Sequence, residues 1–345
     1  MAALAIVTSS PPSVEGGHLV IARSLVQAAR EAGHDAHLVV TADFGFGHQT
    51  KSYAANYLHD VSQIHGRRID QVISLRYPSY AVRHPKHVSW LNHTMREYYD
   101  RWPAFSASIS APNRVKESIR RALTHAADRH LLTQHVTRVV AQSQTIQRRL
   151  LEDFGIRANV ILPPPPQRPY RCDGYGAEML VISRLTPHKR VDLVLRAIAE
   201  PAARHARVTI VGDGDCRTEL ERLASTLGVA NRTTFLGAVD DRTLVDWLAK
   251  CRAVCFTPVE EDYGFVTVEA FAARKAVITC HDSGGPSELV VDGESGFICE
   301  PTPASVAAAI ARLVEDATLA ERLGDKGGAR AAEMTWSSVV AALLV

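Results

Sequence analysis

The chain alternates short apolar runs with amphipathic stretches from its first residues onward. Short apolar runs favour buried strands, and apolar positions three and four apart favour helices. Leu4–Thr8 is predicted to be a strand, the Gly16-Gly17 turn leads into a helix that runs to about Ala32, and His37–Thr41 is the next strand. Further elements of the first half are strands at 71–74, 88–91 and 136–141 and a helix at 144–153, which Ser143 caps.

This pattern stops at Pro163-Pro-Pro-Pro166 and then starts again. Four prolines continue neither a strand nor a helix and predict a stiff, extended link. The predicted strands after it are 179–183, 208–211, 233–236, 253–256 and 276–279, and the predicted helices are 190–198, 216–227, 240–250 and 266–273. Such alternation is typical of α/β folds, so we predict two doubly wound domains, residues 1–163 and 164–335. We expect the ligand to bind at the carboxyl ends of the strands, in a cleft where the two domains face each other.

Composition agrees with this organisation and narrows the class of protein. The 345 residues are 46% apolar and 22% charged, which is an ordinary globular balance for two domains. No run of 18 apolar residues is present, and the first residues lack a basic segment, so we expect a cytoplasmic protein. The six cysteines, all in the second half, show no CxxC spacing and are expected to be buried, reduced thiols.

The charge is unevenly distributed although the net value is only +2. Residues 1–163 hold 19 Lys/Arg against 12 Asp/Glu, while residues 164–345 hold 20 against 25, and twelve of the fifteen histidines lie in the first half. The first half therefore either meets an anionic partner, such as a phosphate, an acidic acceptor or the inner face of a membrane, or simply carries a solvated basic face.

Two glutamates eight positions apart, Glu261 and Glu269, are the most informative feature of the second half. A glycine turn and the start of a helix separate them, and two helical turns rise about 11 Å, so the two carboxylates cannot share a proton or a metal ion. Between them, the N–H groups of Gly264, Phe265 and Val266 would point out of a helix N-terminus, which is a ready phosphate site. This arrangement suggests a clamp for a nucleotide sugar.

Arg184 and Lys189 follow a predicted strand in Ser183-Arg-Leu-Thr-Pro-His-Lys-Arg190. An arginine fork and a lysine point charge at the carboxyl end of a strand suit a diphosphate whose charge grows as it leaves. Two solvated cations on a loop are the alternative, but the clamp in the same domain favours the binding role.

Together with these residues, several other motifs resemble glycosyltransferase family 4, the retaining Glu-x7-Glu enzymes with a two-domain GT-B fold. The resemblance covers nearly the whole chain; it is strong from 178 to 300 and looser from 42 to 85. The motifs are Val211-Gly-Asp-Gly214, Phe235-Leu-Gly237, Asp282-Ser-Gly-Gly-Pro286, Asp292-Gly-Glu-Ser-Gly-Phe297, and Trp90-Leu-Asn-His93 with Arg96, Tyr99-Asp100 and Trp102.

The resemblance implies a role for individual residues of this chain. Arg184 and Lys189 would bind the donor diphosphate, Glu269 the ribose, and Glu261 a hydroxyl of the donor sugar. The resemblance also implies backbone contacts: Gly16 and Gly17 would lie at the phosphate, and Gly237 and Ala238 at the base. The backbone of Gly264, Phe265, Val266 and Thr267 would lie beside the sugar. His93, in the first domain, would lie near the anomeric carbon and the acceptor. The resemblance further implies that residues 336–345 form a helix that returns to the first domain.

The implied activity is transfer of a hexose-like sugar from a nucleoside-diphosphate sugar, UDP rather than GDP, by same-face displacement. Asp213-Gly-Asp215 looks like a metal motif, but we predict a glycine turn there and neither a metal ion nor any other cofactor, since Arg184 and Lys189 can neutralise the diphosphate. The acceptor hydroxyl can belong to a polysaccharide, a lipid-linked intermediate or a small natural product; no nucleic-acid partner is expected.

An oxidoreductase is disfavoured because no Gly-x-Gly-x-x-Gly follows a strand. The other alternative is an inactive subunit that only binds the nucleotide sugar.

Overall fold

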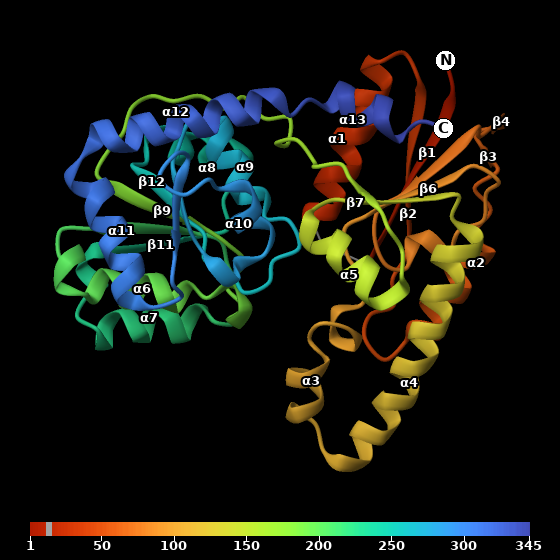
Figure 1. Cartoon of the computed structure of the whole chain (residues 1–345), viewed down its shortest axis with the longest axis horizontal. Helices are drawn as coiled ribbons and strands as arrows, with labels where there is room; N and C mark the ends of the chain where they lie inside the picture. The colour runs from red at the N-terminus through yellow and green to blue at the C-terminus, as the bar shows by residue number, and fades with distance from the viewer. Residues whose placement is uncertain (12–15) are drawn as a thin grey trace. The chain divides into compact units, whose positions relative to one another are not determined.

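The computed structural model describes residues 1–11 and 16–345 and consists of two compact units. Unit 1 comprises Met1–Pro163 and Thr335–Val345, and unit 2 comprises Pro164–Met334. Each unit has a six-stranded sheet of parallel strands with helices around it (Figure 1). The predicted fold class, α/β with two Rossmann-like domains, is confirmed.

The sheet of unit 1 has the strand order β2-β1-β5-β6-β7-β8, so the chain reverses direction across the sheet beside its first strand. That first strand is fully apolar and buried from Ala3 to Val7, as its sequence predicts. The strands of this sheet are β1 (Ala3–Ser10), β2 (Asp35–Ala42), β5 (Gln71–Ser74), β6 (His87–Leu91), β7 (Arg138–Ala141) and β8 (Asn159–Val160). Unit 1 also has a separate hairpin of β3 (Gln63–Ile64) and β4 (Arg67–Arg68). Its helices are α1 (Gly17–Glu31), α2 (Gln49–Leu58), α3 (Trp102–Ser108), α4 (Ala111–His130), α5 (Gln144–Phe154) and α13 (Trp336–Leu343).

Unit 2 repeats this plan with the strand order β11-β10-β9-β12-β13-β14. Its strands are β9 (Glu178–Ile182), β10 (Arg207–Val211), β11 (Thr233–Gly237), β12 (Ala253–Cys255), β13 (Val277–Cys280) and β14 (Gly296–Cys299). Its helices are α6 (Val191–Ala199), α7 (Arg217–Thr226), α8 (Asp241–Lys250), α9 (Phe265–Ala272), α10 (Gly285–Leu289), α11 (Pro303–Glu315) and α12 (Ala317–Glu333). The central strand β9 lies between β10 and β12, so the loop after it leaves from the middle of the sheet.

The last residues of the chain pack onto unit 1. The ring of Trp336 meets the ring of Trp90 edge-on, 6.2 Å between centroids. Gln71 fixes the end of α13, because its Nε2 donates to the carbonyl of Leu343 at 2.7 Å and its Oε1 accepts from the N–H of Val345 at 3.0 Å. Thr335, which the sequence analysis places in the second domain, caps α13 and belongs to unit 1.

Two further features of the fold differ from expectation or add to it. All six cysteines are free, but only four are buried, since Cys172 and Cys216 are half-buried. Helices α3 and α4, for which the sequence pattern gives no prediction, form a hairpin that extends beyond the sheet of unit 1 (Figure 1). Across the described residues, 1–11 and 16–345, no helix combines the length and the apolar character needed to cross a bilayer.

Candidate active site

The loop that carries Arg184 and Lys189 starts at the carboxyl end of β9. The neighbouring turn, Val211-Gly-Asp-Gly214, packs directly against it. A Cβ at Gly212 would lie 1.9 Å from the carbonyl oxygen of Ser183, so only glycine allows this approach. The Ser183 N–H donates to the Val211 carbonyl at 2.9 Å, which joins the two strand ends.

The Gly-Asp-Gly turn is closed by its own aspartate. The Oδ1 of Asp213 accepts from the N–H of Gly214 at 2.8 Å, which is the local hydrogen bond that the sequence predicts. The Leu185 N–H donates to the Asp213 carbonyl at 2.9 Å, so the backbone of this turn also holds the Arg184 loop. The Asp213 carboxylate therefore serves the loop geometry.

Lys189 and Glu261 are in direct contact although 72 residues separate them. The Nζ of Lys189 donates to Glu261 Oε2 at 2.7 Å, and both side chains are mostly buried. The ammonium group also lies 5.4 Å from the centre of the Phe256 ring. A lysine has three N–H donors, so this contact leaves donors for a further acceptor. The structure thus brings together one of the predicted cations and one of the predicted carboxylates.

The backbone around Glu261 is fixed by its neighbours. Its N–H donates to the Ser283 carbonyl and its carbonyl accepts from the Gly285 N–H, both at 2.9 Å. Arg190 braces the same region, because its guanidinium donates to both carboxylate oxygens of Asp282, at 2.6 and 2.7 Å, and to the Pro258 carbonyl at 3.0 Å. Arg190 is known from the sequence only as the last residue of the motif that begins at Ser183, and its bracing role is not predictable from that motif.

Helix α9 begins at the predicted phosphate seat. Its N-cap, Gly264, has φ 83°, a left-handed conformation that favours glycine, and a Cβ there would lie 2.7 Å from Pro286 Cγ and 2.9 Å from Phe256 Cε1. The predicted start of this helix, Val266, is one residue late, since α9 begins at Phe265. The first turn leaves backbone N–H groups without intrahelical acceptors, and the Thr267 N–H turns back to the Gly264 carbonyl at 3.0 Å.

Glu269 is buried within α9 and is held by two residues from the segment that follows the polyproline link. Arg168 forms an ion pair with Glu269 Oε1, and the hydroxyl of Tyr170 donates to the same oxygen at 3.0 Å. Arg168 also pairs with the exposed Asp241 at 2.8 Å. Burial raises the pKa of Glu269 above its ordinary value, while Arg168 and Tyr170 act in the opposite direction.

Arg168 and Tyr170 are functional candidates that the sequence analysis misses. They lie about 100 residues before Glu269, and no local pattern relates an arginine after a proline run to a distant helix. An indirect signal exists, because a glutamate inside an otherwise apolar helix needs a partner when it is buried. The sequence gives the need for that partner but not its identity.

The other predicted residues of unit 2 lie at neighbouring strand ends. Arg184 is exposed, two residues after β9, and Gly237 ends β11, where its carbonyl accepts from the Gly212 N–H at 2.8 Å. Ala238 follows and is exposed. Strands β9, β10 and β11 are adjacent, so Arg184, the Gly-Asp-Gly turn and Ala238 follow three neighbouring strands at one edge of the sheet.

The residues predicted in the first domain lie at the corresponding edge of unit 1. Gly16 is the N-cap of α1 and Gly17 its first residue, but most of the loop that precedes them, residues 12–15, lies outside the described residues. His93 lies two residues after β6. Its Nδ1 is 2.7 Å from the Thr94 carbonyl, and because a carbonyl only accepts, Nδ1 carries a proton.

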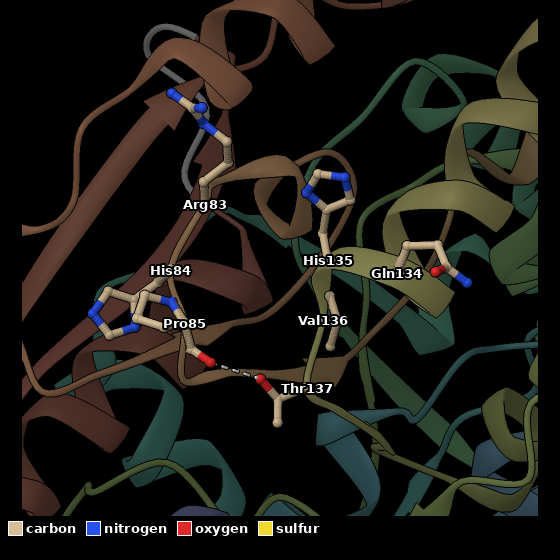
Figure 2. A pocket seen from close by; sticks show the side chains of 7 residues that line it. All are labelled: Arg83, His84, Pro85, Gln134, His135, Val136 and Thr137. Carbon is tan, nitrogen blue, oxygen red and sulfur yellow. Dashed lines mark hydrogen bonds between the residues drawn. The ribbon is translucent and has the colours of Figure 1, made fainter.

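A separate open hollow of about 450 Å³ lies elsewhere in unit 1 (Figure 2). It is lined by residues 83–85, which precede β6, and by residues 134–137, which precede β7, and the Thr137 hydroxyl donates to the Pro85 carbonyl at 3.2 Å across it. These residues are at the amino ends of parallel strands, whereas ligands of doubly wound sheets bind at the carboxyl ends. The hollow is therefore not the site that the sequence predicts.

Comparisons with known proteins show that the chain is similar to glycosyltransferases. The chain is 31% identical over 198 residues to D-inositol 3-phosphate glycosyltransferase 2 of Catenulispora acidiphila, covering 54% of this chain but only 44% of that protein. It is 25% identical over 285 residues to alpha-D-kanosaminyltransferase of Streptomyces kanamyceticus, covering 79% and 68% of the two chains.

The whole fold also has a counterpart among solved structures. HepE of Anabaena, solved in complex with UDP and glucose, superposes with a TM-score of 0.72 over 98% of both chains, at 19% sequence identity. This likeness concerns the fold, and it agrees with two Rossmann-like domains of the GT-B class. Within the sequence, residues 173–330, which hold Arg184, Lys189, Glu261 and Glu269, match the family of Glycosyl transferases group 1.

Proposed function

We propose that this chain is a glycosyltransferase that moves a sugar from a nucleoside-diphosphate sugar to a hydroxyl acceptor with retention of anomeric configuration. The observation that carries the proposal is the contact of Lys189 with Glu261 at 2.7 Å, beside the N-terminus of the helix that contains the buried Glu269. This arrangement lies within the residues that match Glycosyl transferases group 1. UDP is the favoured nucleotide, in keeping with the UDP and UDP-glucose complexes of HepE.

The donor diphosphate would be held by cations and backbone N–H groups. Lys189 keeps ammonium donors beyond the one used by Glu261, and Arg184 supplies a guanidinium at the end of β9. The N–H groups of Gly264, Phe265 and Val266 at the start of α9 add the positive end of a helix dipole, whereas the Thr267 N–H is already used by the Gly264 carbonyl. Such a site neutralises the leaving group without a metal ion.

The two carboxylates would recognise the two ends of the donor. Arg168 and Tyr170 both bind Oε1 of Glu269, and this contact orients the carboxylate while its other oxygen can accept from a ribose hydroxyl. Glu261 would accept from a hydroxyl of the sugar. The backbone at Gly237 and the adjacent Ala238 would face the base.

The transfer would then follow a same-face displacement. The acceptor oxygen bonds to the anomeric carbon on the face from which the diphosphate leaves, the bond from that carbon to the phosphate oxygen breaks, and the acceptor proton passes to the departing diphosphate. Arg184 and Lys189 would stabilise the growing negative charge, which is the main electrostatic contribution expected of the protein. His93 would help to position the acceptor, whether polysaccharide, lipid-linked intermediate or small natural product.

Donor turnover tests this proposal and separates it from an inactive binding subunit. The protein is incubated with UDP-, GDP- and ADP-sugars and mixed acceptors, and release of free nucleoside diphosphate is measured. We expect turnover of a UDP-sugar by the wild type, a loss of at least about a hundredfold in Lys189→Ala, and no loss in the exposed control Lys250→Ala. The anomeric configuration of the product is read by NMR. Binding without any turnover would support the inactive subunit, and an inverted product would contradict the same-face route.

A further inference from the structure

Lys275 is a lysine that is fully buried in unit 2. It lies three residues after α9, its ammonium group donates to the Gly174 carbonyl, and the same group lies 4.2 Å from the centre of the Tyr175 ring. Across the described residues, its contacts include no carboxylate. A buried cation is costly unless an anion compensates it, so the remaining contact of this lysine is of interest.

That contact is the side chain of Cys172. The Nζ of Lys275 donates to Cys172 Sγ at 3.3 Å. A thiolate at this position compensates the buried ammonium, and a lysine beside a cysteine favours the thiolate, which is the nucleophilic form of the residue. Cys172 is free and half-buried, and its neighbours Arg171 and Asp173 are exposed, so small solutes can reach it.

The other cysteines have different surroundings. Burial raises the pKa of Cys251 to about 12, although Lys275 acts in the opposite direction, so this thiol stays protonated. Cys216 is half-buried like Cys172, but burial and the nearby carboxylate of Glu219 raise its pKa. The structure describes all six cysteines, and among them Cys172 alone accepts a hydrogen bond from a lysine.

We propose that Cys172 and Lys275 form a site of oxidative modification, at which a peroxide oxidises the sulfur and the amine captures it in a covalent sulfur–nitrogen bond. The sulfur first attacks one oxygen of hydrogen peroxide, and the O–O bond breaks. The leaving hydroxide takes a proton from the ammonium group, which gives a sulfenic acid, a neutral amine and water. The nitrogen then bonds to sulfur, and the S–OH bond breaks to release a second water with a proton from the nitrogen. The protein loses two hydrogens in total, and peroxide accepts the two electrons.

The bond would join the two segments that meet at Glu269. Cys172 lies two residues after Tyr170, which contacts Glu269 together with Arg168, and Lys275 follows the helix that carries this glutamate. Residues 171–176 belong to no helix or strand, so the sulfur can approach the amine without disrupting either. A link between residues 103 positions apart restricts the unfolded chain and should stabilise unit 2. The modification does not depend on the transfer reaction.

Mass spectrometry of the full chain provides the test. The reduced protein is separated from its reductant and treated with hydrogen peroxide, the remaining thiols are blocked with iodoacetamide, and the chain is digested. We expect two peptides linked through Cys172 and Lys275, about 2 Da lighter than their sum, which dithiothreitol separates again. The linked protein should melt at least about 5 °C higher than the reduced protein.

Three variants accompany the wild type. Lys275→Met keeps an unbranched side chain but removes the amine, so the link should be absent and Cys172 should proceed to sulfinic acid. Cys172→Ser should also lack the link. Cys216→Ser is the matched control, because it removes a half-buried thiol that has no lysine contact, and it should form the link as the wild type does.

The outcomes that would overturn the proposal are read first in the wild type, so they do not depend on the folding of a variant. They are a Cys172 that becomes sulfinic acid while Lys275 stays unmodified, a disulfide between Cys172 and another cysteine, and a Cys172 that does not react. A linked pair that retains an oxygen would contradict the condensation step. A loss of about 2 Da that persists in Lys275→Met would overturn the assignment to Lys275, because a backbone nitrogen would then have captured the sulfur.

Discussion

The ion pair between Arg168 and Glu269 gives a sharp test of how the site is built. The Glu269 side chain is only 6% exposed and that of Arg168 15%, so Arg168→Gln leaves a buried carboxylate without its counter-charge. Breaking a buried pair by removing one partner costs about 3–5 kcal/mol. The Tyr170 hydroxyl remains at 3.0 Å, and a hydrogen bond to a charged group contributes about 1.5–3 kcal/mol. We therefore expect Arg168→Gln to lower the free energy of unfolding by about 2–3 kcal/mol at pH 7.5.

The pH dependence of this loss follows from the direction of the pKa shift. Burial already raises the pKa of Glu269, and removing Arg168 removes the main group that lowers it, so the folded-state pKa rises further. A carboxyl group with a raised folded-state pKa favours the folded state below its unfolded pKa, near 4.3, and loses that contribution as the pH rises through the folded value. The difference between Arg168→Gln and the wild type should therefore be small near pH 4.5 and grow toward pH 7.5.

Urea unfolding at both pH values measures this, with Arg171→Gln as the control. Arg171 lies three residues further along and pairs with Asp173 and Asp246, but these side chains are about 40% exposed, so its loss should cost less than about 1 kcal/mol. A double-mutant cycle with Glu269→Gln should give a coupling of about 2 kcal/mol at pH 7.5. If Arg168→Gln cost no more than Arg171→Gln, or its cost did not change with pH, the reasoning about a buried pair would be wrong.

Three further predictions concern the start of α9, the buried carboxylate of α4 and the C-terminus. Gly264→Ala should lower the unfolding free energy by about 2–3 kcal/mol, measured in urea, because its φ is 83° and its Cβ would lie 2.7 Å from a proline side-chain carbon; no loss would show that the turn relaxes. Burial raises the pKa of Asp128 to about 6, so its contribution to stability is present below about pH 4 and lost as the pH rises through 6. Wild type should therefore lose about 3 kcal/mol relative to Asp128→Asn between pH 4 and 7, and parallel pH profiles of urea unfolding would contradict this. Truncation after Thr335 removes the buried side chains of Trp336 and three aliphatic residues of α13, which contribute about 6–12 kcal/mol through apolar burial. The melting temperature of unit 1 should therefore fall. An unchanged thermal unfolding curve would contradict the docking of α13.

The α/β alternation was predictable because most helices and strands of both units obey the usual rule of apolar residues inside. Strand β5 has the predicted bounds, Gln71–Ser74, and the helix after Ser143 is capped as expected, by a hydrogen bond of 3.1 Å from the Ile146 N–H to the Ser143 hydroxyl. Helix α4 escaped prediction because it reverses the rule: its buried positions are polar and its large apolar side chains are exposed. Pattern analysis locates the core side of a helix by its apolar residues, so it cannot assign such a helix.

In the candidate site, too, some features could be predicted from local sequence, while others depend on tertiary packing. The positions of Arg184, Lys189 and Glu261 after strands, and of Gly264 before a helix, follow from local sequence. The pairing of Lys189 with Glu261, the brace from Arg190 to Asp282, and the contact of Arg168 with Glu269 join segments 72 to 101 residues apart. These contacts depend on how the loops pack at one edge of the sheet, which no single segment specifies.

A crystal structure of the protein with UDP bound is the most direct test of the central claim. The account predicts that the diphosphate oxygens lie within hydrogen-bonding distance of Arg184, Lys189 and the first-turn N–H groups of α9, and that a ribose hydroxyl donates to Glu269. UDP bound at another place, with these side chains keeping only the contacts described above, would contradict it.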